Sequence, residues 1–263
     1  MWDPTVYRRF GTERSRPFFD LVGRVGADKP RAVADLGCGP GELTATLTDR
    51  WPGARVTGID SSPEMIERAA ELDSAAGFEV GDVRDWHPGP DVDVLITNAV
   101  LQWVPGHPEL LDRWAGELPA GAWLAMQVPG NFDAPSHRAL REVASTGPWA
   151  ARLDGLLREA PVDDAAGYAT RLTGLGATVD AWETTYVHLL PEDPQHAGDR
   201  TRHPVLRWME GTALRPVAAA LDADAWQAFR GALAARLADA YPARNGVVAF
   251  PFRRVFVVAK TKE

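Results

Sequence analysis

Glycines alternate in one short stretch of the chain, Asp35-Leu36-Gly37-Cys38-Gly39-Pro40-Gly41, which follows an apolar run and precedes a helix-length segment. Glycine lets a backbone turn sharply and approach a ligand without a Cβ clash. The first turn of a helix presents N–H groups that lack partners within the helix. The stretch therefore predicts a ligand-binding turn, in which Cys38 is a small turn residue because no histidine stands beside it in sequence to activate a thiol.

The residue after the last glycine bears on the charge of the ligand. A dinucleotide fingerprint counted from Gly37 needs a third glycine where Glu42 stands. An acidic side chain opposes a pyrophosphate, so the turn favours a cationic ligand. A nicotinamide-dependent dehydrogenase stays open as an alternative, because a glycine turn followed by an acidic Asp60 also suits that class.

The glycine stretch is similar to motif I of the class I, seven-stranded S-adenosylmethionine methyltransferases. The resemblance implies that Asp35 lies near the amino group of the methionyl part of this cofactor. It also implies that Gly37, Gly39 and Gly41 form the backbone bed beneath it. The predicted fold is accordingly α/β, with a Rossmann-like seven-stranded sheet.

Further polar residues end later strands of the predicted sheet. Asp60 comes about twenty residues past the turn, where α/β folds place a carboxylate against ribose hydroxyls, although it could instead cap the helix that starts at Pro63. The resemblance places Asp82 against the adenine amino group, with Asp85 and Trp86 as competitors for that role. The predicted cofactor-binding residues are Asp35, Gly37, Gly39, Gly41, Asp60, Ser61, Asp82, Val83 and Asn98.

Segments outside the generic cofactor fold resemble a narrower family. The opening MWDP with Tyr7, and the runs 98–107, 128–132, 182–186 and 250–254, look like the trans-aconitate 2-methyltransferase family. The resemblance implies a small polycarboxylate acceptor, one carboxylate of which becomes a methyl ester, and S-adenosyl-L-homocysteine as the second product. Methylation of another small acid or alcohol, and a catalytically silent cofactor-binding module, remain alternatives.

A carboxylate acceptor is ionised at neutral pH and needs no general base. Catalysis then consists of orientation, exclusion of water and charge balance, so we assign no catalytic residue. Arginine suits the charge balance because its planar fork binds a carboxylate at two points. Neighbouring strand residues face opposite ways, so at most one of Arg253 and Arg254 reaches the pocket, and the aromatic candidates could equally pack in the core. The pocket candidates are Tyr7, Arg14, Gln102, Trp103, His107, Asn131, His137, Arg138, Arg253 and Arg254.

Short apolar runs alternate with helix-length segments, as in a parallel sheet with crossover helices. We expect one domain covering residues 1–263, with helical insertions at about 131–163 and 191–250 that form a lid over the active site. The predicted strands are 31–35, 55–60, 77–80, 92–98, 122–128, 178–190 and 253–259, and the predicted helices are 42–51, 63–72, 108–118 and 165–175.

Composition excludes several other functions. A net charge of -8 disfavours nucleic acid as a partner. The single cysteine rules out an intrachain disulfide and a thiolate metal cluster, and we expect no metal. No apolar run is long enough for a membrane span, and the N-terminus lacks the apolar region of a signal peptide. We therefore expect a cytoplasmic protein. We also expect a monomer or weak homodimer that acts on a small molecule.

Overall fold

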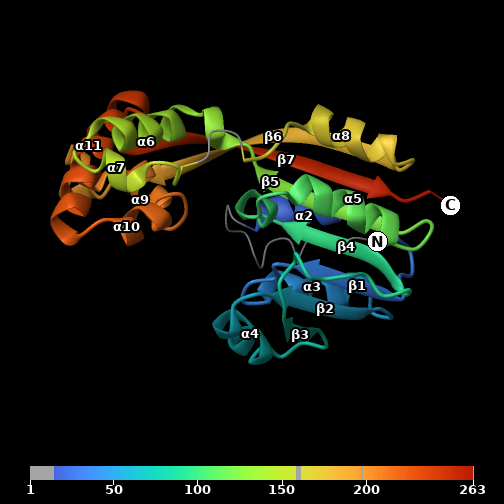
Figure 1. Ribbon diagram of the computed structural model, residues 1–263. Coiled ribbons are helices and arrows are strands. Elements are labelled where there is room, and N and C mark those ends of the chain that lie inside the picture. Colours follow the sequence, from blue (N-terminus) through green and yellow to red (C-terminus); the bar gives the residue numbers. More distant parts are fainter. Residues whose placement is uncertain (1–14, 158–160, 197, 263) are drawn as a thin grey trace. The chain divides into compact units, whose positions relative to one another are not determined.

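A mixed sheet forms the centre of the computed structural model, which describes residues 15–157, 161–196 and 198–262. Within these residues, seven strands lie in the order β3-β2-β1-β4-β5-β7-β6 (Figure 1). β3, β2, β1, β4 and β5 are parallel, and β7 is antiparallel to β5. This arrangement confirms the predicted seven-stranded α/β class. The strands are β1 (Ala32–Leu36), β2 (Arg55–Asp60), β3 (Gly77–Val80), β4 (Val92–Asn98), β5 (Trp123–Pro129), β6 (Thr178–Pro191) and β7 (Val247–Lys260).

Helices α3 (Glu42–Arg50), α4 (Pro63–Ala70) and α5 (His107–Glu117) occupy connections between the parallel strands. Two further helices flank these strands in the sequence: α2 (Arg16–Val22) precedes β1, and α8 (Ala165–Gly174) precedes β6. α4 begins as the sequence predicts, because Pro63 takes the first helical position and the Ser62 hydroxyl accepts a hydrogen bond from the Met65 N–H at 3.4 Å.

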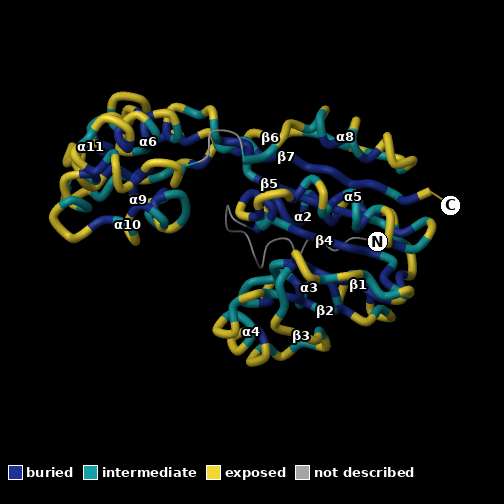
Figure 2. The backbone as a smooth tube through the Cα atoms, viewed as in Figure 1, coloured by how far each residue is buried: buried dark blue, intermediate teal, exposed yellow. Residues whose placement is uncertain are grey.

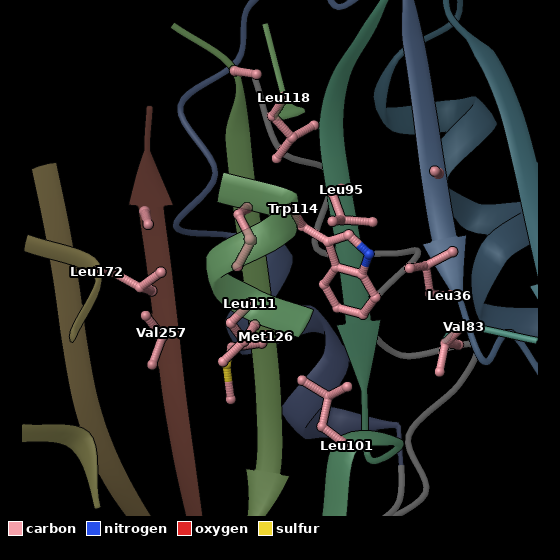
Figure 3. Packing of buried hydrophobic residues seen from close by; sticks show 14 of the residues in the cluster. Leu36, Val83, Leu95, Leu101, Leu111, Trp114, Leu118, Met126, Leu172 and Val257 are labelled. Carbon is pink, nitrogen blue, oxygen red and sulfur yellow. The ribbon is translucent and has the colours of Figure 1, made fainter. Parts of the chain in front are cut away.

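The central strands are buried along nearly their whole length, as Figure 2 shows in dark blue. Helices cover both faces of such a sheet, so its strands are continuously apolar. Against one face α5 packs Leu111 and Trp114, which contact the layer containing Leu95 and Met126 (Figure 3). Each large side chain of this kind contributes about 1.5–3 kcal/mol through its burial. This core fixes the strand ends that carry the site.

The chain divides into two compact units. Unit 1 comprises residues up to 129 together with 162–184 and 254–263, and it contains most of the sheet. Unit 2 comprises 130–161 and 185–253 and has an apolar core of its own, in which Phe229, Leu233 and Phe250 are fully buried. Besides the outer parts of β6 and β7, its described elements are η2 (Asn131–Asp133), α6 (Pro135–Thr146), α7 (Ala150–Leu153), η3 (Pro194–His196), η4 (Arg200–Arg202), α9 (Pro204–Glu210), α10 (Arg215–Ala220) and α11 (Ala223–Ala240).

The last strand differs from its prediction. We expected it to start at Arg253, but β7 starts at Val247 and passes through Pro251. Proline lacks the N–H that a ladder needs and is usually confined to strand edges. β7 pairs with β5 only from Arg254 onward, so Pro251 lies outside that ladder and deprives β5 of no hydrogen bond.

Across the part of the chain that is described, none of the helices combines the length and the apolar character that crossing a membrane requires.

Candidate functional site

The glycine turn lies between β1 and α3, and its three glycines have left-handed backbones. The φ angles are 76° at Gly37, 56° at Gly39 and 79° at Gly41. A Cβ at Gly37 would come within 2.1 Å of the Val100 side chain, whereas a Cβ at Gly39 would meet nothing within 4 Å. Gly37 is therefore required by packing, and the backbone at Gly39 borders open space. Such a cradle suits a ligand that approaches the main chain closely.

Cys38 lies within this turn and packs closely against Gly58, where an added Cβ would meet the Cys38 Sγ at 2.9 Å. Burial, followed by the charges of Asp35 and Asp60, raises the pKa of the Cys38 thiol to about 12. The thiol stays protonated at neutral pH, which agrees with a turn residue rather than a nucleophile.

Asp35 is a buried acidic residue in β1, with 3% of its surface exposed. Its carboxylate accepts a hydrogen bond from the Thr44 hydroxyl at 2.6 Å. Burial raises the pKa of Asp35 to about 6, with a contribution from the charge of Asp60, while the Thr44 bond lowers it. A cationic group placed beside this carboxylate would favour its ionised form. The residues of the turn therefore fit a ligand that carries an amino group.

Asp60 links the turn to the end of β2. One carboxylate oxygen accepts the Gly39 N–H at 2.9 Å, and the other accepts the Ser62 N–H at 2.9 Å. The residue that caps α4 is Ser62, so the capping alternative for Asp60 does not hold. An ionised carboxylate offers about four acceptor positions, which leaves room for ribose hydroxyls beside these two bonds. Ser61, next in the chain, is exposed.

Asp82 and Val83 follow β3. The Arg84 side chain pairs with both Asp82 oxygens, with distances of 2.9 Å from Nε and 2.5 Å from a terminal nitrogen. These bonds, together with one from the Arg84 backbone, lower the pKa of Asp82 to about 2. Val83 is buried in the core, whereas the Asp82 side chain is partly exposed.

The end of β4 carries a strained backbone and a polar cluster. Ala99 has a φ of 58°, which is uncommon for a residue with a Cβ and costs of order 1–3 kcal/mol. The Gln102 side chain donates to the Ala99 oxygen at 2.6 Å, and the Ala99 N–H donates to the Gln127 oxygen at 2.9 Å. Asn98 is half-buried, and its side-chain oxygen has no partner among the described residues. Trp103 is 56% exposed, so it is not a core residue of unit 1.

His107 is the first residue of α5 and is buried, with its ring against Tyr168 of α8. One ring nitrogen is 2.7 Å from the Tyr168 hydroxyl, and the other is 3.3 Å from the Val104 oxygen. Burial raises the pKa of Tyr168 to about 12, so its hydroxyl stays neutral. His107 thus connects Val104, in the loop after β4, with α8, and its role as a pocket residue stays a prediction.

Four pocket candidates lie in unit 2. The Asn131 side-chain oxygen accepts the Arg253 N–H at 2.5 Å, and the Arg253 guanidinium donates to the Gly130 oxygen at 3.1 Å. His137 is held neutral because burial and the charge of Arg141 lower its pKa to about 4. Arg138 is exposed and donates to the Asp133 oxygen at 2.7 Å. Asn131 and Arg253 are thus brought together.

The remaining pocket candidates are Arg254, Tyr7 and Arg14. Arg254 is buried in β7 of unit 1, with 8% of its surface exposed, and its guanidinium donates to the Gln127 side-chain oxygen at 3.3 Å. Tyr7 and Arg14 lie outside the described residues.

Sequence reasoning missed three residues that contact the candidates, namely Thr44, Gln127 and Tyr168. A glutamine in the apolar run WLAMQV was a signal that could have pointed to Gln127. Thr44 and Tyr168 carry no such signal, because each looks like an ordinary helix residue.

A family model described as a methyltransferase domain matches residues 33–120, which span β1 through α5. Among solved structures, the YcgJ protein of Bacillus subtilis superposes with a TM-score of 0.60 at 12% identity, covering 94% of this chain and 99% of that one. A phosphoethanolamine N-methyltransferase of Haemonchus contortus, solved with S-adenosyl-L-methionine, gives a TM-score of 0.54 at 16% identity and covers 94% of this chain and 53% of that one. The strand order and the glycine turn after β1 thus define a class I methyltransferase fold.

Curated relatives resemble the chain along its whole length. A trans-aconitate 2-methyltransferase of Mycolicibacterium gilvum is 56% identical, with 100% of both chains covered. Proteins of the same name from Rhodococcus jostii and Mycobacterium tuberculosis are 53% and 49% identical, covering at least 99% of this chain and 97% of each relative. The chain belongs to the trans-aconitate 2-methyltransferase family. The predicted enzyme class is confirmed, and the dehydrogenase alternative is removed.

Proposed function

We propose that the protein transfers the methyl group of S-adenosyl-L-methionine to one carboxylate of trans-aconitate, giving a monomethyl ester and S-adenosyl-L-homocysteine. S-adenosyl-L-methionine is the methyl donor of this class of enzyme. The observation that carries the proposal is identity of 49–56% to proteins named for this reaction, extending over the whole chain. That extent includes the loops outside the cofactor fold.

The cofactor site is proposed from unit 1. The backbone of the glycine turn accepts the methionyl part, and Asp35 pairs with its amino group. Asp60 receives the ribose hydroxyls, since its carboxylate is held at the carboxyl end of β2 by two backbone N–H groups. Asp82 is proposed to face the adenine amino group. Its pairing with Arg84 keeps the carboxylate ionised and able to accept a hydrogen bond.

The chemical step needs little from the protein beyond placement. A carboxylate oxygen donates an electron pair to the methyl carbon, and the carbon–sulfur bond breaks with its electron pair staying on sulfur. The sulfonium thereby becomes a neutral thioether. A carboxylate is already ionised at neutral pH, so no proton has to be removed. The protein contributes alignment and the exclusion of water.

Arginine and amide groups are proposed to bind the acceptor. Arg254 on β7 is the arginine candidate of unit 1, because it lies beside the end of the parallel strand β5. The other described candidates of unit 1 are Gln102, Trp103 and His107. Asn98, at the end of β4, is proposed to bind the cofactor. Arg253 of unit 2 is the alternative to Arg254, since at most one of these neighbours reaches the pocket. Its backbone N–H is hydrogen-bonded to the side chain of Asn131, another candidate, and His137 is a neutral polar candidate a short way along the chain. The helical insertions remain proposed as a lid.

The acceptor is tested with a panel. Purified protein is incubated with S-adenosyl-L-methionine and trans-aconitate, with other small acids, and with small alcohols, and the products are analysed by mass spectrometry. We expect a methyl ester with trans-aconitate at the highest rate. Ester formed only from a different acid, or ether formed from an alcohol, would replace the proposed acceptor while leaving the methyltransferase class intact.

The remaining expectations concern partners and location. We propose a cytoplasmic enzyme that acts on a small molecule, does not bind nucleic acid, and exists as a monomer or weak homodimer. The net charge of -8 supports the expectation that the protein does not bind nucleic acid. Light scattering and a filter-binding assay with duplex DNA test the oligomeric state and the lack of affinity for nucleic acid.

A further inference from the structure

Gln127 lies where β4 and β5 end, and its main chain and side chain both make contacts there. Its backbone oxygen accepts the N–H of Ala99, the residue with the strained backbone, at 2.9 Å. Its side-chain oxygen accepts a hydrogen bond from the Arg254 guanidinium at 3.3 Å. One residue therefore connects the turn after β4 with a buried arginine on β7.

The side-chain nitrogen of Gln127, Nε2, makes no hydrogen bond within the described part of the chain. Gln127 is 1% exposed, so this nitrogen is buried. Asn98 is the register partner of Gln127 on β4, so the two side chains lie on the same face of the sheet. Its Oδ1 is also buried without a partner among the described residues. Two such groups side by side indicate that this face meets a polar ligand, because a buried polar group without a hydrogen bond costs free energy.

Arg254 belongs to the same face. It lies two residues from Phe256, the register partner of Gln127 on β7, and side chains two apart in a strand point the same way. Arginine is charged at every accessible pH, and its fork binds a carboxylate at two points. Ligands of open α/β sheets bind at the carboxyl ends of the parallel strands, which is where this face lies.

We propose that Gln127 is a positioning residue of the acceptor site, which orients the Arg254 guanidinium toward a carboxylate of the acceptor other than the one that is methylated. The inference rests on the proposed function and adds Gln127, to which the proposed function assigns no role. A neutral amide orients the guanidinium without cancelling its charge. A glutamate at the same position would bind Arg254 as an internal carboxylate and compete with the acceptor.

The test compares acceptors that differ in charge. Mesaconate and itaconate each lack one of the three carboxyl groups of trans-aconitate. We expect Gln127→Glu to raise the KM for trans-aconitate about tenfold or more, to leave the KM for S-adenosyl-L-methionine within about twofold, and to reduce the preference for trans-aconitate over at least one analogue by about tenfold. A residue that only supports the fold would not change that preference.

Matched variants complete the experiment. Gln227→Glu is the control, since the exposed Gln227 also accepts a hydrogen bond from an arginine, Arg230, at 3.5 Å, but on α11 of unit 2. Thermal melting checks the fold of each variant. If Gln127→Glu does not fold, Gln127→Met is measured in its place. We expect a smaller rise in the KM for trans-aconitate and a smaller loss of preference for it, because the orienting oxygen is gone but no competing charge is added.

The outcomes separate the two proposals. A wild-type enzyme that methylates none of the three acids overturns the proposed function and this inference with it. A wild-type enzyme that is active, with Gln127 variants that keep the KM and the preference for trans-aconitate, overturns the inference alone. An equal rise in the KM for both substrates also overturns it, since Gln127 would then act through the cofactor site or the fold.

Discussion

The Thr44 hydroxyl donates a 2.6 Å hydrogen bond to the carboxylate of Asp35, and both residues are buried. Burial raises the pKa of Asp35 to about 6, the Thr44 bond opposes that rise, and the charge of Asp60 adds to it. A cation placed near Asp35 would lower this pKa and convert the carboxyl group fully to its charged form. Binding of the cofactor and protonation of Asp35 are expected to be linked.

Asp35 should reduce the stability of the cofactor-free protein at neutral pH. Its pKa rises from 3.8 in the unfolded chain to about 6 in the folded one. The folded state therefore binds more protons between these values, and stability is lost as pH rises from about 4 to about 6. Two pKa units correspond to about 3 kcal/mol. We expect Asp35→Asn to match the wild type in urea unfolding near pH 4 and to be more stable by up to about 3 kcal/mol at pH 7. The same pH dependence in both proteins would contradict this.

Cofactor affinity should rise with pH, whereas the stability of the cofactor-free protein should fall. Below the pKa of about 6, Asp35 must lose a proton before it can pair with an amino group. We expect the affinity for S-adenosyl-L-homocysteine, measured by calorimetry, to increase up to about tenfold per pH unit between pH 5 and 6 and to level off above that. Asp35→Asn should bind weakly at every pH and lack this dependence. A wild-type affinity that is constant from pH 5 to 7 would argue against the pairing.

Thr44→Val tests the hydrogen bond separately. Valine keeps the shape of threonine but cannot donate, so the pKa of Asp35 should rise further because the bond that lowers it is gone. The pH at which affinity levels off should move upward. Thr46→Val is the control, since the Thr46 hydroxyl on the same helix donates only to the Leu43 oxygen. An identical shift in both variants would exclude a specific role for Thr44.

Gly37→Ala should be more damaging than Gly39→Ala. Both positions have a positive φ, which costs alanine roughly 1–2 kcal/mol. Only the Cβ at Gly37 would also overlap the Val100 side chain, at 2.1 Å. We expect a larger loss in the free energy of unfolding for Gly37→Ala, partly recovered by adding Val100→Ala. Equal losses for the two alanines, with no recovery, would show that the clash is relieved in some other way.

The parallel core could be predicted closely from sequence. β2, β3 and β4 occupy the ranges expected, Arg55–Asp60, Gly77–Val80 and Val92–Asn98, because short segments containing β-branched or aromatic residues are bounded there by polar or glycine residues. The start of β7 could not be predicted, because Pro251 indicates a break in a strand unless it is known that β5 does not pair with this part of β7.

The contacts between site residues could not be predicted from the sequence. The bond between Arg254 and Gln127 joins positions 127 residues apart, and the one between His107 and Tyr168 joins positions 61 apart. Pairings of this kind depend on strand register and helix docking, which a local pattern does not encode. The glycine turn could be predicted because its residues adjoin one another in sequence.

Transfer of a labelled methyl group tests the central claim most directly. The wild-type protein is mixed with S-adenosyl-L-methionine carrying a trideuterated methyl group and with trans-aconitate, and the product is analysed by mass spectrometry before and after treatment with hydroxide. We expect trans-aconitate that carries one intact trideuteromethyl group, which hydroxide releases as methanol because the linkage is an ester. Trans-aconitate that remains unlabelled, or a label that hydroxide does not release, would contradict methylation of a carboxylate.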